Sequence, residues 1–209
     1  IIPMNFFKKF LLSFCYKTSA YSQAGQDLFA LELFGKRGTY IDIGAGHPTK
    51  GSNSYLLEAF NEWKGFSVEL SRENKYLWDT SKIRKNKIYW EDATTFDYSR
   101  AIIENKLSHD VDFLSCDIDP QFKTLLALKK LINDGIRPAY VAFETDQYKI
   151  DTNYSELARL FLEPHGYKVG VKNIYSNLKK NKIFETWFVK KSLNYNLTEY
   201  SNWVNKYKN

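Results

Sequence analysis

The sequence contains little cysteine, proline or glycine. Its two cysteines, Cys15 and Cys116, stand far apart in the 209 residues, and Cys116 lies in an apolar segment. This number and spacing exclude a disulfide framework and a cysteine-rich metal site, and they favour a reducing compartment, so we expect a cytoplasmic protein. Five prolines and ten glycines leave little room for disordered segments.

Long apolar runs are also missing. The stretch NFFKKFLLSF at residues 5–14 is shorter than the roughly 20 residues of a membrane-spanning helix, so we expect a soluble protein. Its phenylalanines share one helical face opposite Lys8 and Lys9. This spacing predicts an amphipathic helical extension over residues 1–20, which packs on its own domain or lies on a membrane surface or a partner.

No internal repeat or linker divides the rest of the chain. We expect one domain over residues 21–192 and a C-terminal helix over residues 193–209 that packs on it. The net charge of +6 permits an anionic partner, but the lysines are scattered and no basic, aromatic-rich stripe is present. Composition therefore does not favour nucleic acid as a partner.

Residues 38–71 combine two strands, a glycine turn and a helix. A short β-rich run at 39–43 contains Asp42 and leads into Gly44 and Gly46, and Ser52 or Asn53 can cap a helix over 55–60. The next apolar run, 66–70, ends near Glu69. An acid at the end of the second strand is placed to bind the hydroxyls of a ribose, so this stretch predicts a nucleotide-cofactor site.

The turn lacks the third glycine of a dinucleotide-binding fingerprint. Thr49 holds that place, Pro48 precedes it, and the helix does not begin at the glycines. The positive end of the helix dipole is therefore poorly placed for a pyrophosphate. An acid followed by Gly-x-Gly without a phosphate-binding device suits S-adenosylmethionine (SAM), whose adenosine has ribose hydroxyls but no phosphate.

Longer motifs surround this turn. The run IDIGAGHPTKGSNSYLLE carries the pattern GA-x-HP-x-x-x-SN-x-Y, and GFSVELS follows it. YSQAGQDLFAL at 21–31 adds an SQ-x-G-Q-D motif, and VDFLSCDID at 111–119 adds a DFLS-x-D-I-D strand. These residues resemble the FkbM-type methyltransferases, class I enzymes that depend on SAM. The resemblance covers about residues 21–190.

Two further segments, YVAFETDQY and IFETWFV, resemble a branch of that family that reads [IV]-T-F-E-H-D-x-Y and FEDWW. This chain has Thr145 where the branch has histidine and Thr186 where it has an acid; Leu70 replaces a family proline after Glu69. The resemblance implies methyl transfer from SAM to a hydroxyl of a sugar or a small glycosylated metabolite. The departures leave open a catalytically degenerate member that binds the cofactor without turnover.

The remaining pattern alternates strands with helices. We expect helices over 22–34, 73–80, 121–134 and 154–162, with Ser22 capping the first, and strands over 87–90, 111–116, 139–143, 167–171 and 183–189. Leu125, Leu126, Leu128 and Leu131 are expected to face the sheet. The fold class is then α/β, a Rossmann-like doubly wound sheet, mostly parallel with one antiparallel strand and with helices on both faces. The class I methyltransferase strand order is what the resemblance implies.

The candidate cofactor residues follow from these positions and from the resemblance. Asp92 and Ala93 come after the third strand, where an acid can accept from the adenine amino group while the next amide meets a ring nitrogen. The residues expected to hold SAM are Asp42, Gly44, Gly46, Glu69, Asp92, Ala93 and Asp117, with Gln23, Ser52 and Asn53 in support.

Acids follow the fourth and fifth strands, which neighbour each other in that order. Asp117, Asp119, Glu144 and Asp146 would converge on one edge, where a divalent cation such as Mg²⁺ or Mn²⁺, held by Asp117, Glu144 and Asp146, would relieve their repulsion. Alternatively Asp117 orients the cofactor, Asp119 caps the next helix and backbone amides hold Glu144. The candidate catalytic residues are Asp119, Glu144, Asp146 and His47. A second reading of the function is an RNA ribose methyltransferase.

Overall fold

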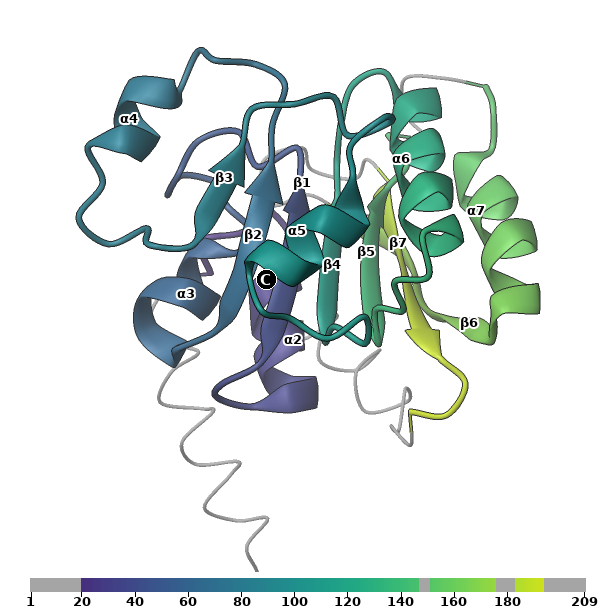
Figure 1. The fold of residues 1–209 in the computed structure, drawn as a ribbon. Helices are drawn as coiled ribbons and strands as arrows, with labels where there is room; N and C mark the ends of the chain where they lie inside the picture. The colour runs from purple at the N-terminus through teal and green to yellow at the C-terminus, as the bar shows by residue number, and fades with distance from the viewer. Residues whose placement is uncertain (1–19, 147–150, 176–182, 194–209) are drawn as a thin grey trace, which may run out of the picture.

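The computed structural model describes residues 20–146, 151–175 and 183–193, which form one seven-stranded sheet with the order β3-β2-β1-β4-β5-β7-β6 (Figure 1). Strands β1 to β5 pair in parallel, and β7 runs antiparallel to both β5 and β6. The strands are β1 (Thr39–Ile43), β2 (Lys64–Val68), β3 (Lys87–Tyr89), β4 (Phe113–Cys116), β5 (Tyr140–Glu144), β6 (Tyr167–Tyr175) and β7 (Ile183–Lys190).

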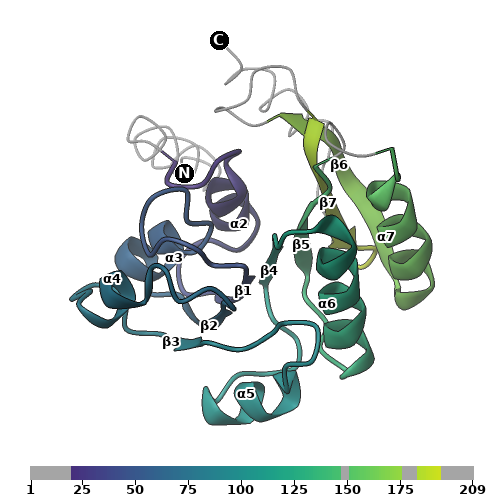
Figure 2. The same cartoon turned by 90° about the horizontal axis from the view of Figure 1, so that it is seen from above.

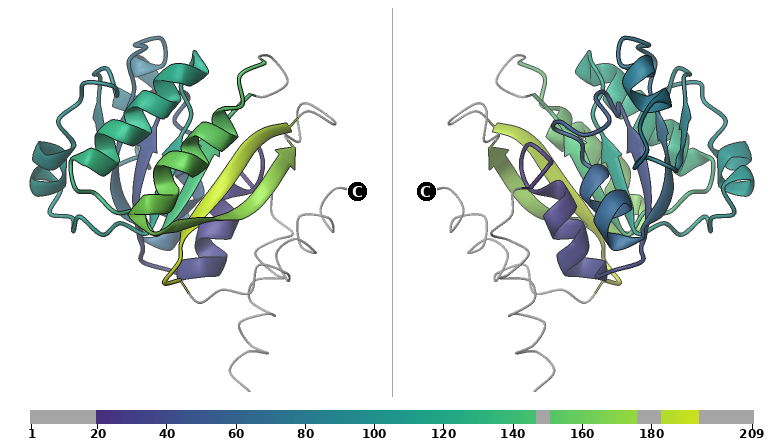
Figure 3. Two further views of the ribbon diagram at one scale, coloured as in Figure 1. Left: turned by 90° about the vertical axis from the view of Figure 1, so that its right-hand side faces the viewer. Right: turned by 90° about the vertical axis from the view of Figure 1, so that its left-hand side faces the viewer.

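Helices cover both faces of the sheet, as the view from above shows (Figure 2). One face carries α2 and α3, and the other carries α5, α6 and α7. In Figure 3, α7 lies beside the long pair of strands β6 and β7. The helices are α2 (Gln26–Phe34), α3 (Tyr55–Asn61), α4 (Lys75–Asp79), α5 (Tyr98–Glu104), α6 (Gln121–Asn133), α7 (Tyr154–Leu162) and the 3₁₀ helix η1 (Glu163–His165).

Alternate residues of the central strands enter two apolar cores. In β1, Ile41 and Ile43 join the core under α5, α6 and α7, whereas Tyr40 joins the core under α2 and α3. All three side chains are fully buried. Burial on both faces explains why the central strands read as nearly continuous apolar runs.

The expected fold class is confirmed, two local expectations are wrong, and one helix was not expected. Leu126 is 48% exposed rather than facing the sheet, because it lies one residue off the buried stripe of α6. Ser22 does not cap α2: its hydroxyl donates to Asp27, and the helix begins only after Gly25. The helix α5 has no counterpart among the expected elements.

The structure does not describe most of the two terminal segments, so the expected helices over residues 1–20 and 193–209 lie outside the described residues. Within the described residues, no helix is both long and apolar enough to cross a bilayer.

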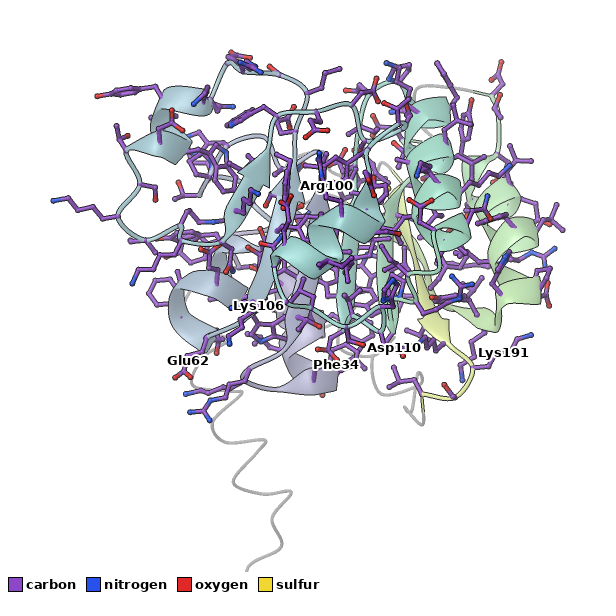
Figure 4. The ribbon with its side chains drawn as sticks, in the orientation of Figure 1. Phe34, Glu62, Arg100, Lys106, Asp110 and Lys191 are labelled. Carbon is purple, nitrogen blue, oxygen red and sulfur yellow. The ribbon has the colours of Figure 1, made fainter. Side chains whose placement is uncertain are left out.

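The five parallel strands all end at the upper edge of the sheet in Figure 1, which we call the carboxyl edge. At the opposite edge, Glu62, Lys106, Asp110 and Lys191 lie at the surface (Figure 4). The acids singled out from the sequence lie at the carboxyl edge instead, where connections between parallel strands form ligand sites.

Candidate functional site

The turn after β1 is forced close to the end of β4. Gly44 has φ of 78° and donates its amide hydrogen to the Val68 carbonyl at 2.9 Å. A Cβ atom at this position would lie 1.6 Å from the Asp117 carbonyl oxygen, so glycine is required for steric reasons. Gly46 has φ of 51° but no atom within 4 Å of such a Cβ, so glycine there serves the backbone conformation alone.

Asp42 lies beneath this turn, on the face of the sheet that carries α2 and α3. Its Oδ2 accepts a 2.5 Å hydrogen bond from the Ser54 hydroxyl, and the side chain is buried. Burial raises the pKa of the carboxyl, and the Ser54 hydrogen bond and the charge of Arg84 oppose that rise. Asp42 therefore supports the turn from inside.

Glu69 ties the end of β2 to the same turn. Its Oε2 accepts from the Gly46 amide at 2.9 Å, and its Oε1 accepts from the Ser71 amide at 2.7 Å. A carboxylate has about four lone-pair positions, so both oxygens keep capacity for further donors such as ribose hydroxyls.

Asp92 is held as a charged acceptor after β3. Its Oδ1 accepts from the amide and the hydroxyl of Thr94, at 2.9 and 2.7 Å, and these bonds keep the pKa of Asp92 below its usual value. Its Oδ2 lies 3.8 Å from Nζ of Lys123, a residue of the first turn of α6 that the sequence reasoning missed.

These groups surround a cavity of about 490 Å³ at the carboxyl edge. It extends along the ends of β1 to β4 and collects several of the acids expected from the sequence. Its lining comprises Gly44, Val68, Glu69, Leu70, Ser71, Asp92, Ala93, Asp117, Ile118, Asp119 and Lys123.

Asp117 stands where β4 ends, next to the turn after β1. Its amide donates to the Ile43 carbonyl at 3.0 Å. Burial, together with the neighbouring carboxyls of Glu185, Asp146 and others, raises the pKa of Asp117 well above its ordinary value. A positively charged ligand group beside Asp117 would be stabilised by this excess of acid.

A side-chain amide, rather than a cluster of ligands, joins the acids after β4 and β5. The Nε2 of Gln121 donates to Asp119 Oδ1 at 3.0 Å and to Asp146 Oδ2 at 2.9 Å. A nitrogen donor therefore lies between these two carboxylates. Among the described residues no three His, Cys, Asp or Glu side chains are arranged to hold a metal ion. The expected Mg²⁺ or Mn²⁺ site of Asp117, Glu144 and Asp146 is therefore not supported.

Glu144 has a carboxylate neighbour that the sequence reasoning did not place in the site. Glu185 of β7 lies opposite Glu144 in the β5–β7 register, and both are buried. The Glu185 oxygens accept from Gln26 Nε2 at 2.7 Å and from Trp187 Nε1 at 2.6 Å, while burial raises its pKa to about 7. Each of the two glutamates stands in a Phe-Glu-Thr sequence, at 143–145 and at 184–186.

His47 is oriented as a donor. Its Nδ1 accepts from the amides of Thr49 and Lys50, at 3.1 and 3.0 Å. In the neutral ring the proton then resides on Nε2, which can donate but cannot accept. This arrangement does not fit a general base, so His47 is better placed to shape the loop.

The three supporting residues lie around the loop and not in the cavity lining of the described residues. Ser52 Oγ accepts from the Tyr55 amide at 3.2 Å, at the start of α3, although the N-cap residue itself is Ser54. Asn53 Nδ2 donates to Ser115 Oγ at 2.8 Å. Gln23 packs beside Gly51, next to the single bridge that joins Ser22 and Gly51.

Solved structures share this arrangement of elements. The magnesium protoporphyrin IX methyltransferase of Synechocystis PCC 6803, crystallised with bound SAM, matches with a TM-score of 0.54 at 12% identity over 79% of this chain and 77% of that chain. The Dnmt2 methyltransferase of S. pombe matches with a TM-score of 0.54 at 15% identity over 77% of this chain and 50% of that one. The chain has the class I methyltransferase fold.

The small RNA methyltransferase HEN1 shares this fold too, with a TM-score of 0.54 at 14% identity over 80% of this chain and 25% of that chain. No protein-family model and no curated protein matches the sequence. At these identities the likeness extends to the class I methyltransferase fold, and the chemistry must be argued from the residues of the site.

Proposed function

We propose that the chain is a SAM-dependent O-methyltransferase of the FkbM type, acting on a hydroxyl of a sugar or a small glycosylated metabolite. The observation that carries the proposal is the cavity at the carboxyl edge, where Glu69, Asp92 and Asp117 stand at the ends of three strands. The class I methyltransferase fold and a solved neighbour with bound SAM support the choice of cofactor. The acceptor class rests on the resemblance of the motifs.

The residues present fit SAM. Asp92 and the Ala93 amide would meet the adenine edge, Glu69 would accept from the ribose hydroxyls, and Asp117 would face the cationic methionine part next to Gly44. When bound, SAM supplies an activated methyl group. The raised pKa of Asp117 and the lowered pKa of Asp92 suit these roles, because a cation favours ionisation of the first and an amino donor needs a charged acceptor in the second.

The chain's own part in the reaction is chiefly to place two reactants in line. Asp119 is the acid of the expected catalytic set that lines the cavity, whereas Glu144 and Asp146 are buried. We therefore assign Asp119 to accept the proton of the acceptor hydroxyl at its carboxylate, while Gln121 fixes its orientation. Glu144 and Asp146 support that edge from inside, and no step requires a metal ion.

The two departures from the family branch have ordinary hydrogen bonds here. The Thr145 hydroxyl donates to the Phe184 carbonyl at 3.2 Å, and the Thr186 hydroxyl lies 2.7 Å from that of Ser155 in α7. Thr186 thus contacts a helix on the far face of the sheet from Asp42. Both threonines are therefore held by hydrogen bonds of the fold. Cofactor binding without turnover across a broad acceptor panel would support the degenerate alternative.

An RNA ribose methyltransferase is the second candidate. The net charge of +6 and the fold shared with a small RNA methyltransferase favour it. Neutralising phosphates would make binding fall steeply as salt rises. Binding of a short RNA at low salt with that dependence would support this reading, and no RNA binding at low salt would remove it.

The proposal also keeps a cytoplasmic location, with which the free, buried thiol of Cys116 is compatible.

Glu69 provides the direct test of the cofactor. Glu69→Gln should weaken binding of S-adenosylhomocysteine by ~10-fold or more, because charge-assisted hydrogen bonds to the ribose are lost. Isothermal calorimetry measures the affinity. Glu91→Gln is the matched control, since Glu91 forms an exposed pair with Arg100 and does not line the cavity.

Two results would contradict the assignment. Unchanged affinity in Glu69→Gln would place the ribose elsewhere, and comparable binding of NADH would remove the methyltransferase proposal itself.

A further inference from the structure

Arg84 lies buried beneath the loop of residues 44–54 that follows β1. It comes from the connection between α4 and β3, a lysine-rich segment that has the composition of a solvated surface. Its side chain is nevertheless 1% exposed, and its Nε lies 2.7 Å from Oε2 of Glu58, whose side chain is 5% exposed.

The guanidinium bonds three separate points of that loop region. Nη1 donates to the Pro48 carbonyl at 3.0 Å and to Ser52 Oγ at 3.1 Å, and Nη2 donates to Ser54 Oγ at 2.9 Å. Ser54 in turn donates to Asp42. The planar, forked guanidinium can meet several acceptors at once, which a lysine ammonium on a flexible stem cannot reproduce.

Trp78 of α4 completes the support. Its ring centroid lies 4.3 Å from the Arg84 guanidinium carbon, and its Nε1 donates to the Gly46 carbonyl at 2.9 Å. The segment that contains α4 and its connection to β3 therefore holds the loop at two places. Trp78 bonds to Gly46, and Arg84 bonds to Pro48, Ser52 and Ser54.

Burying an ion pair is costly, and well-packed apolar side chains of similar volume often give equal or greater stability. Here the guanidinium fixes geometry: Arg84 donates hydrogen bonds to a loop that contains three residues with positive φ, Gly44, Gly46 and Gly51. Inside the loop the amides of Thr49 and Lys50 bond to His47, whereas Arg84 holds Pro48, Ser52 and Ser54 from outside the loop.

The loop's position along the cavity indicates what it receives. Asp92 follows β3 and Glu69 follows β2, so adenine and ribose would lie at those ends, and the remainder of the cofactor would extend over Gly44 and Asp117 at β1 and β4. We propose that Arg84 is a positioning residue that presets this loop to bind the methionine half of the cofactor. The inference rests on the proposed function.

The test compares two ligands that differ in that half alone. S-adenosylhomocysteine carries the amino acid group, whereas 5′-methylthioadenosine lacks it. Arg84→Lys keeps the charge beside Glu58. It should weaken binding of S-adenosylhomocysteine by ~10-fold and change that of 5′-methylthioadenosine by less than about 2-fold, because the shorter bonds that are lost, to Pro48, Ser52 and Ser54, position the loop. Calorimetry gives both affinities, and Glu69→Gln should reduce both.

Controls separate this effect from damage to the fold. Arg100→Lys, an exposed arginine on α5 (Figure 4), should leave both affinities unchanged. If Arg84→Lys does not fold, Trp78→Phe keeps the ring under the guanidinium, removes the donor to Gly46, and should shift the same ratio in the same direction. If a folded variant binds both ligands more weakly by the same factor, or binds both as tightly as the unchanged protein does, the inference is overturned. Failure of the unchanged protein to bind either ligand would instead overturn the proposed function on which it rests.

Discussion

At the scale of single residues, Gln121 decides the character of the acidic edge. Its amide bonds two carboxylates from different strand ends, Asp119 and Asp146, and its side chain is buried. An amide can satisfy two acceptors without adding charge, so Gln121 holds the two carboxylates together by hydrogen bonds. Gln121 thus links the end of β4 to the end of β5 through its side chain.

Replacing this amide by a third carboxylate should convert the arrangement into a cation site. In Gln121→Glu three acids would repel each other, and Mn²⁺ would relieve that repulsion. We expect Mn²⁺ to raise the melting temperature of Gln121→Glu and not that of the unchanged protein, in thermal melts with and without the metal.

Gln121→Asn serves as the uncharged control and should not respond to Mn²⁺. Chelator should leave S-adenosylhomocysteine binding by the unchanged protein as it is. An equal Mn²⁺ response in the unchanged protein and in Gln121→Glu would show that the acids already bind a cation.

The acids at the strand ends could be predicted from position alone, whereas their partners could not. Glu69 and Asp92 follow apolar strands, and parallel strands bring such residues to one edge. Arg84 and Gln121 gave no such signal, because one stands among surface-type lysines and the other begins an ordinary amphipathic helix. What each contacts is set by tertiary packing between segments distant in sequence.

At the scale of elements, regular segments with strong periodicity were predicted well. The strand over 39–43 matches β1, and α7 begins and ends as expected. The helix α5 was not predicted, although Asp97 caps it and accepts a hydrogen bond from the Arg100 amide. Spacing of Tyr98, Ala101 and Ile102 would have predicted it.

The junction of β1, its turn and β4 yields a prediction from sterics. Gly44→Ala would place a methyl group against the Asp117 carbonyl, and two paired strands cannot separate to admit it. We expect the free energy of unfolding to fall by about 3 kcal/mol or more. Gly46→Ala, with open space around its Cβ, should cost about 1 to 2 kcal/mol from its positive φ.

Urea denaturation of both variants measures the difference, and folded Gly46→Ala provides the matched control for substitution at a positive φ. Similar losses at the two positions would mean that the close approach of Gly44 to β4 does not constrain the fold.

At the scale of the whole molecule, buried carboxyls make stability depend on pH. Burial raises the pKa of Asp27 in α2 to about 6 and that of Glu185 in β7 to about 7, and it also raises that of Asp117. Each folded-state pKa then exceeds its unfolded value. The stability from these groups is complete below the unfolded values near 4 and is lost as pH rises through the folded values.

Surface acids act in the opposite sense but in another range. Hydrogen bonds from Lys190 and Lys87 lower the pKa values of Asp110 and Glu104, so their contribution disappears only as pH falls below the ordinary values near 4. Between pH 5 and 8 the buried groups should dominate. We therefore expect the cofactor-free protein to lose roughly 4 kcal/mol of stability across this interval, which corresponds to a fall of about 10 °C in melting temperature.

Glu185→Gln tests the contribution of Glu185, which accepts hydrogen bonds from Gln26 and Trp187. The amide mimics the protonated acid, so its melting temperature should vary less between pH 5.5 and 8 than that of the unchanged protein. Glu91→Gln, an exposed acid, should keep the full dependence. Melts in buffers of equal ionic strength make the comparison. Stability that rises with pH over this range, or an undiminished slope in Glu185→Gln, would mean that Glu185 is ionised in the folded protein because its bonds from Gln26 and Trp187 outweigh burial.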